Sequence, residues 1–191
     1  MAGLPPLRQR PPEAVHSTGI SGPVEVAVDL ELPVPLPAAA PQPAHPISIG
    51  FYSGTWYEIA RTPNGTQKDC HAPTSQFTGG GGGRYDMVQI CRKGSPAGAP
   101  KVWRARGSIV PDSGNAKFRM NFFGVVSQEY WILDSAADQS WVVMATPGGN
   151  YVWLMSRKPV MAPAAKAAAL SHINALGYNV ARLEQPRQPP A

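Results

Sequence analysis

Gly50-Phe51-Tyr52-Ser53-Gly54-Thr55-Trp56-Tyr57-Glu58-Ile59-Ala60-Arg61 separates two unlike parts of the chain. Before this stretch, closely spaced prolines block helices and central strands and favour extended polyproline II. After it, short segments of alternating apolar and polar residues recur with turn residues between them. Within it, Gly54 and Trp56 indicate a close backbone approach followed by a large ring that enters a core. We therefore expect an arm over residues 1–46, one folded domain over 47–185 and a loose tail over 186–191.

The folded part is predicted to be all-β. Short strands with short connections indicate an antiparallel meander, and eight strands can close into a barrel without exposed edges. Such a barrel is wide enough to hold one small ligand. A helix over residues 164–176, rich in alanine, should pack outside it, and residues 178–183 are expected to form a last short strand. The eight strands are expected near residues 56–61, 70–78, 85–92, 101–110, 116–123, 128–134, 140–146 and 151–157.

The arm contains one segment with a different pattern. From Val24 to Leu32, valine and leucine alternate mainly with acidic residues, which is the period of a strand. Two interpretations remain open. The alternation is accidental in a disordered leader, or its apolar face docks on the barrel, on a second copy or on another subunit.

Charge is unevenly distributed along the chain. Residues 1–46 hold two arginines against four acidic residues, whereas the rest holds 15 basic and 8 acidic residues. A basic surface of this kind attracts anionic lipid head groups or an acidic partner, so peripheral membrane contact is one expectation. The basic residues are scattered and accompany no recognition motif, so we expect no nucleic-acid binding. No apolar run is long enough to span a bilayer, and we expect neither a secretory signal nor a lipid-bearing cysteine at the start.

Cys70 and Cys91 flank the glycine run at 79–83. If the hairpin is centred between Gly80 and Gly81, the two cysteines face each other directly. Their side chains then lie on one face at a separation that a disulfide can bridge. A disulfide indicates an oxidising compartment such as the periplasm. The alternative is two reduced thiols that align by chance.

Several kinds of catalytic or cofactor site are not expected. The four histidines and two cysteines lack metal-ligand spacing, and no Gly-x-Ser-x-Gly elbow is present. The glycine run has no Lys-Ser/Thr after it and precedes a strand, so it does not match a phosphate loop. We therefore expect no metal, no cofactor and no enzymatic activity.

Five segments together resemble one family. Gly54-Thr55-Trp56-Tyr57 resembles the opening signature of the lipocalins, and Tyr151 to Pro159 resembles the last strand of their bacterial outer-membrane members. The segments 117–124, 129–134 and 178–180 resemble the family's intervening strands and closing motif, in the same order. Apolipoprotein D is similar in its opening signature. The resemblance covers roughly residues 47–185 and implies an eight-stranded up-and-down barrel, closed at one end and open at the other, that binds small apolar ligands.

The resemblance also implies roles for individual residues. Trp56, with Gly54 before it, would plug the closed end of the barrel, and Arg157 would lie over its ring. If Trp56 and Arg157 point inward, then Glu58 and Ala60 on the first strand and Trp153 and Met155 on the last strand do so too. The inward residues expected to contact a ligand are Glu58, Phe118, Met120, Phe122, Tyr130, Ile132, Met144, Tyr151, Trp153 and Met155. The role of Glu58 stays open among pairing with a basic group, protonation and contact with water.

Two functions are compatible with this sequence. The first is binding or carriage of a fatty acid, lysophospholipid or similar molecule at the bacterial cell envelope, in the periplasm or at the outer membrane. The second is an accessory subunit of a larger, membrane-bound assembly, docked through residues 1–46. The second follows from the arm, which replaces the lipid-anchoring cysteine that bacterial relatives usually carry.

Overall fold

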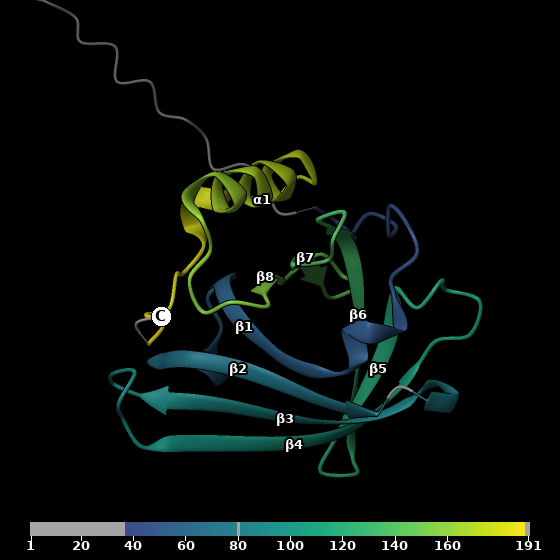
Figure 1. The fold of residues 1–191 in the computed structure, drawn as a ribbon, viewed down its shortest axis with the longest axis horizontal. Helices are drawn as coiled ribbons and strands as arrows, with labels where there is room; N and C mark the ends of the chain where they lie inside the picture. Colours follow the sequence, from purple (N-terminus) through teal and green to yellow (C-terminus); the bar gives the residue numbers. More distant parts are fainter. Residues whose placement is uncertain (1–36, 80, 190–191) are drawn as a thin grey trace, which may run out of the picture. The chain divides into compact units, whose positions relative to one another are not determined.

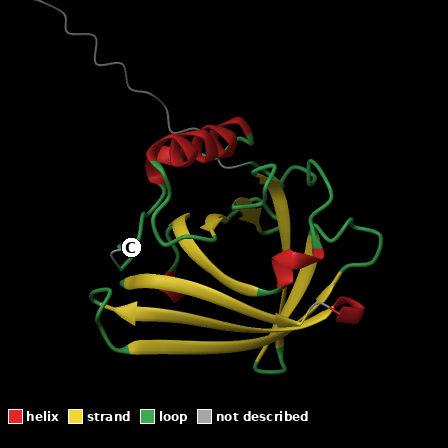
Figure 2. Cartoon of the chain, in the orientation of Figure 1, coloured by secondary structure: helices red, strands yellow, loops and turns green. Residues whose placement is uncertain are grey.

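The computed structural model describes residues 37–79 and 81–189, whose strands form one closed antiparallel barrel (Figure 1). Each strand pairs with its neighbour in sequence and β8 returns to β1, which confirms the predicted up-and-down barrel. Figure 2 shows the strands in yellow and the one long helix in red outside them. The strands are β1 (Gly54–Arg61), β2 (Cys70–Gly79), β3 (Arg84–Lys93), β4 (Pro100–Ile109), β5 (Lys117–Phe122), β6 (Val126–Ser135), β7 (Trp141–Ala145) and β8 (Val152–Ser156).

The alternation of each strand divides the buried side chains into two clusters. The inner core lies inside the barrel, and the outer core lies between the barrel wall and the helix α1 (Pro163–Ala175). Members of the inner core include Phe51, Tyr52, Trp56, Phe77, Tyr85, Phe118, Met120, Ile132, Val142, Met144 and Met155. Members of the outer core include Ile59, Ala60, Leu133, Val143, Leu154, Ala169, Ile173 and Tyr178.

A short 3₁₀ turn, η1 (Ile49–Tyr52), and Trp56 seal one end of the barrel. The Trp56 side chain is buried, and its Nε1 donates a hydrogen bond to the Phe51 carbonyl at 2.9 Å. The guanidinium carbon of Arg157 lies 3.8 Å from the centre of the Trp56 ring. Arg157 also donates to the carbonyls of Gly50 (2.7 Å) and Ser53 (2.8 Å). The arginine therefore joins η1, the start of β1 and the end of β8.

The inward parity expected for the first strand fails at Ala60. A bulge shifts the pairing of β1 with β8, so Glu58 opposes Met155 but Ala60 opposes Leu154. An extra residue inverts the faces of a strand from that point on. Ala60 therefore belongs to the outer core, and Arg61 turns inward beside Glu58.

The disulfide between Cys70 and Cys91 is confirmed, but the expected register is wrong. The hairpin turns through η3 (Gly81–Gly83) rather than between Gly80 and Gly81, and a bulge between His71 and Thr74 shifts the pairing again. Cys70 consequently opposes Lys93, and its bridge to Cys91 runs diagonally, with the two Cα atoms 5.3 Å apart. Diagonal neighbours still share one face of a sheet, so the bond forms without direct opposition.

Helix α1 packs against β7 through Ala169 and Ile173, as its alanine-rich stripe predicts. Pro163 occupies its first turn, and Gly177 follows its end with a φ of 91°, where glycine carries no Cβ penalty. Across the part of the chain that is described, no helix is long and apolar enough to span a membrane.

The strand expected over residues 178–183 is absent from that segment. Asn179 instead caps a 3₁₀ turn, η4 (Val180–Arg182), by accepting a hydrogen bond from the Ala181 N–H at 3.0 Å. An asparagine that accepts from a nearby backbone N–H favours such a turn over a sheet ladder. Strand-like pairing is limited to one bridge, between Arg61 and Glu184.

The last residues of the arm lie against the outside of the barrel. The Ala40 N–H donates to the Pro147 carbonyl and the Ala44 N–H to the Leu133 carbonyl, both at 2.9 Å. Ala40 is buried in the outer core. The alternating segment 24–32 lies outside the described residues, so its docking and the boundary at residue 46 stay predictions.

Candidate ligand-binding site

A cavity of about 550 Å³ lies inside the barrel at the end opposite Trp56. This volume is within the range of small-molecule sites, roughly 300–1,000 Å³. All eight strands contribute to the wall, and the β1–β2, β5–β6 and β7–β8 connections contribute to the rim of the mouth. The lining residues are Glu58, Asn64, Gly65, Thr66, Gln67, Ser75, Met87, Gln89, Trp103, Met120, Phe122, Phe123, Val126, Gln128, Tyr130, Met144, Thr146, Tyr151, Trp153 and Met155.

Methionine and aromatic side chains make up most of the apolar wall. Met87, Met120, Met144 and Met155 come from four different strands, and Tyr130 packs edge-on against Trp153 with ring centres 5.8 Å apart. Methionine adapts to irregular ligand shapes because it is unbranched and polarisable. Burial raises the pKa of Tyr130 to about 12, so its phenol is neutral at physiological pH. The wall therefore suits an uncharged, flexible, apolar group.

Eight of the ten residues expected to contact a ligand line this cavity, and two do not. Phe118 and Ile132 are fully buried in the inner core, where Phe118 stacks on Tyr130 with ring centres 5.5 Å apart. They support the wall from behind. Which of the lining residues bind a ligand stays a prediction.

Glu58 is held in a buried network beside the cavity. Its two carboxylate oxygens accept hydrogen bonds from Arg61 Nη1 and Gln67 Nε2, both at 2.7 Å. Arg61 also donates through Nε to Glu184 (2.9 Å) and through Nη2 to the carbonyls of Gln67 (3.0 Å) and Cys70 (3.3 Å). Of the three alternatives for Glu58, the structure shows pairing with a basic group.

This network connects the polar side of the cavity to the loop at its mouth. Gln67 Oε1 accepts from Asn64 Nδ2 (2.8 Å) and from Trp153 Nε1 (3.2 Å). Burial raises the pKa of Glu58, while Arg61 and Gln67 oppose that rise. Because both of its oxygens are occupied, Glu58 fixes the β1–β2 loop rather than acting as a free acid.

Some lining residues were not among those expected from the sequence. Met87 and Gln89 share the inward face of β3 with Tyr85 and Cys91. The alternation along that strand could therefore have identified them as lining residues. Trp103 lies on β4, whose pattern is weak because its outward residues are also mixed in character. Thr66 and Phe123 belong to connections, where strand periodicity gives no guidance.

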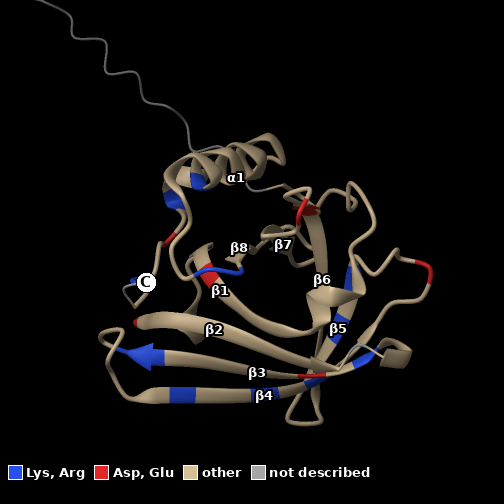
Figure 3. Cartoon of the chain, in the orientation of Figure 1, with Lys and Arg blue, Asp and Glu red and all other residues tan. Residues whose placement is uncertain are grey.

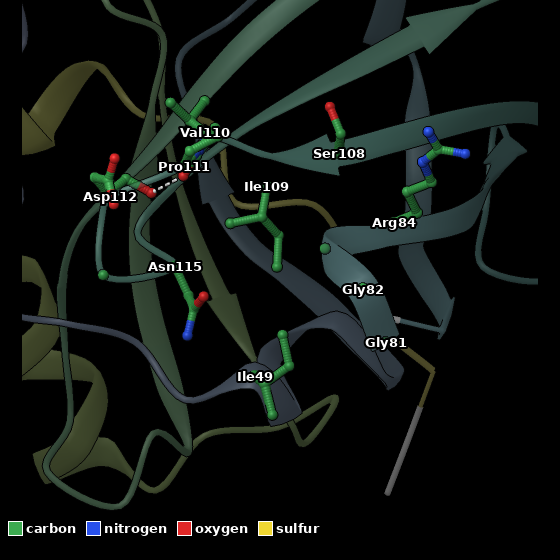
Figure 4. Close-up of a pocket in the computed structure, with 13 residues that line it drawn as sticks. Ile49, Gly81, Gly82, Arg84, Ser108, Ile109, Val110, Pro111, Asp112 and Asn115 are labelled. Carbon is green, nitrogen blue, oxygen red and sulfur yellow. Dashed lines mark hydrogen bonds between the residues drawn. The ribbon is translucent and has the colours of Figure 1, made fainter.

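A second hollow, of about 700 Å³, lies outside the barrel at its sealed end (Figure 4). The β4–β5 connection, the glycine turn η3 and Ile49 surround it, and the Ser113 hydroxyl donates to the Val110 carbonyl at 2.7 Å. Trp56 and the inner core separate it from the cavity. Within residues 37–79 and 81–189, no group of three His, Cys, Asp or Glu side chains is arranged to hold a metal ion.

Comparisons with known proteins identify the family. The outer membrane lipoprotein Blc of Citrobacter freundii is 24% identical over 142 residues, covering 73% of this chain and 78% of Blc. Blc of Escherichia coli K12 is 22% identical over 140 residues, covering 72% and 77%. The structure of insecticyanin from the tobacco hornworm Manduca sexta superposes with a TM-score of 0.62 at 15% identity, covering 83% of this chain and 88% of insecticyanin.

A model of the lipocalin-like domain matches residues 47–188, which is most of the chain. Proteins of this fold bind small hydrophobic ligands and are typically not enzymes, in agreement with the expectation of a binding protein. The chain belongs to the lipocalin family.

Proposed function

We propose that the barrel binds an amphiphile with a long acyl chain, such as a fatty acid or lysophospholipid, and carries it at the bacterial cell envelope. The observation that supports this most strongly is the cavity itself. It is lined mainly by methionine and aromatic side chains, and its polar groups lie near the mouth, along the Glu58–Gln67 side and at Ser75 and Gln89 on β2 and β3. An acyl chain fits the apolar depth and a head group fits the polar mouth.

The energetics of this wall are adequate for binding. An acyl chain that buries about 300 Å² of apolar area gains about 7 kcal/mol at ~25 cal/mol per Å². Loss of translational freedom and chain ordering offset part of this gain, so the affinity from the apolar wall alone is expected to be weaker than about 10 μM, the value that about 7 kcal/mol would give. The head group adds specificity through Asn64, Thr66 and Gln128, which border the cavity.

The envelope location rests on two observations. The curated relatives are outer membrane lipoproteins, although they are only 22–24% identical to this chain. The Cys70–Cys91 disulfide is typical of an oxidising compartment such as the periplasm. Both observations support a protein that works outside the cytoplasm.

Titration with a fluorescent long-chain fatty acid tests the proposal, with a variant that fills the cavity. Met120 points into the cavity and its neighbour Asn121 is exposed on the same strand. Met120→Trp should weaken binding at least tenfold because the larger ring occupies the space of the chain, whereas Asn121→Trp should bind like the wild type. Melting curves show whether each variant is folded, since overpacking costs about 1–3 kcal/mol. Equal affinity in a folded Met120→Trp protein would reject the cavity as the site.

A second function, as a subunit of a larger assembly docked through the arm, is favoured by one observation. The family match begins at residue 47, so the family pattern does not account for the 46 residues before it. Deletion of residues 1–36 retains the segment 37–46 that packs on the barrel. If the arm recruits a partner, this truncation should keep fatty-acid affinity and lose co-purification with the assembly. Unchanged co-purification would argue against the arm.

A further inference from the structure

Large apolar side chains are exposed together in one turn at the mouth. The β5–β6 connection and its flanks read Phe122-Phe123-Gly124-Val125-Val126. Phe123 is 73% exposed, Val125 84% and Val126 55%. Solvent-exposed turns are usually polar, so an apolar tip of this kind indicates a contact surface.

The backbone of this turn makes the choice of phenylalanine unfavourable for folding. The Val125 N–H donates to the Phe122 carbonyl at 3.2 Å, and φ is positive at both central residues, 56° at Phe123 and 75° at Gly124. Such hairpin turns favour Asn-Gly, whereas a bulky residue at positive φ is strained. Phe123 thus occupies a position where asparagine would stabilise the fold better. The requirements of the fold alone therefore do not explain the phenylalanine.

The turn lies at the mouth of the cavity. Phe123 and Val126 line the cavity and also face solvent, so they join its interior to the surface. Tyr151, in the β7–β8 connection, is a further lining residue that is partly exposed. A ligand that enters or leaves through this mouth passes the apolar tip. In Figure 1 the turn is the short connection between β5 and β6, on the side away from α1.

The rim around the mouth is basic. Lys68 lies in the β1–β2 connection, Lys93 ends β3, and Lys101 lies at the start of β4, where its Nζ is 4.5 Å from the centre of the Trp103 ring. Figure 3 shows these ends of β3 and β4 in blue. Asp69 is the acidic residue in the rim connections, and it lies 3.5 Å from His71 Nε2. The mouth therefore combines an apolar turn with more basic than acidic side chains.

We propose that the open end docks on an anionic lipid bilayer, with the turn 123–126 in the interfacial region and the basic rim against the head groups. Apolar residues in the interface and lysines near an anionic surface each favour such binding. A second copy of the chain fits less well, because it would bring two basic rims together. This inference rests on the proposed function in one respect. If the barrel carries an acyl ligand, the ligand would pass between the bilayer and the cavity without crossing water.

Vesicle co-sedimentation tests the docking directly. The full chain is mixed with vesicles of phosphatidylglycerol and phosphatidylcholine, and separately with vesicles of phosphatidylcholine alone. We expect binding to the anionic vesicles that weakens as salt is added. Val125→Ser should reduce it about tenfold, and Lys93→Gln about fivefold. Val125 lies outside the cavity lining, so fatty-acid affinity should not change.

Two matched variants control for general surface effects. Val160 is 53% exposed and lies beyond the end of β8, away from the mouth, and Lys158 is exposed in the same connection. Val160→Ser and Lys158→Gln should bind vesicles like the wild type. If they weaken binding as much as the rim variants, the docking face is not the mouth and the proposal is wrong.

A third variant separates folding from docking. Phe123→Asn should raise the melting temperature by about 2–4 °C because it relieves the strained turn, and should lower vesicle binding at least as much as Val125→Ser. Wild-type vesicle binding in Phe123→Asn would overturn the proposal. A failure of the wild type to bind anionic vesicles would also overturn it. If light scattering then shows a dimer that Val125→Ser dissociates, the turn is an interface between two copies of the chain. The fatty-acid titration is independent, so loss of docking with retained fatty-acid binding refutes this inference alone.

Discussion

Replacement of Arg61 by methionine should destabilise the protein by about 3–5 kcal/mol at neutral pH. Arg61 and Glu58 are both almost fully buried, with Nη1 and Oε1 2.7 Å apart. Removal of the arginine leaves the Glu58 carboxylate without its charged partner, and breaking a buried pair costs about that much. The cost of the loop contacts to Gln67 and Cys70 is included in this figure.

The loss should depend on pH in a defined direction. Burial already raises the pKa of Glu58, and the attraction and hydrogen bond of Arg61 are what oppose the rise. Without Arg61 the folded-state pKa rises further above the unfolded-state value. A raised carboxyl pKa contributes stability that is fully present below the ordinary value of 4.5 and is lost as pH rises through the folded pKa. Arg61→Met should therefore be closest to the wild type in acid and weakest at neutral and alkaline pH.

Urea unfolding with the disulfide intact measures the effect at several pH values. Arg106→Met is the matched control, because the Arg106 side chain is 92% exposed and its substitution should cost under about 0.5 kcal/mol. The double variant Arg61→Met with Glu58→Gln should recover stability at neutral pH, since no buried charge remains. A loss below about 1 kcal/mol for Arg61→Met at neutral pH, or a loss that grows in acid, would refute this account of the network.

Three further outcomes are expected. Arg157→Ala should lower the melting temperature without changing fatty-acid affinity, because Arg157 contacts the Trp56 ring and nearby carbonyls at the sealed end; a selective loss of affinity would contradict this. Reduction of the Cys70–Cys91 bond should cost about 3 kcal/mol for a loop with a separation of 21 residues, measured by urea unfolding with and without reductant; equal midpoints would count against it. Tyr178→Phe should be neutral or slightly stabilising, because the buried Tyr178 hydroxyl has no hydrogen-bond partner among the described residues; a clear loss of stability in a thermal melt would show a partner in solution.

The overall architecture could be predicted from the sequence because its signals are local and repeated. Each element is predicted by residues within or beside it. Alternating apolar residues predict the strands, turn residues predict the connections, and the alanine-rich segment before Gly177 predicts the helix. The inward faces of β5 and β7 follow from simple alternation, and Met120, Val142 and Met144 lie where it places them.

The features that could not be predicted depend on a bulge and on turns. The bulge in β1 moves Ala60 outward and brings Arg61 beside Glu58, and no residue type in that segment marks it. The glycine run allows several turn positions at similar cost, so the register of Cys70 could not be fixed from the sequence. The rim residue Phe123 escapes alternation because it lies in a turn.

The central claim is that an acyl chain occupies the barrel cavity. Photocrosslinking with a fatty acid that carries a photoreactive group at its chain end, followed by peptide mass spectrometry, tests this most directly. We expect labels on the peptides that contain Met87, Met144 and Met155, which line the cavity on three different strands. Labels confined to the outer core beneath α1 or to the hollow at the sealed end would contradict the claim.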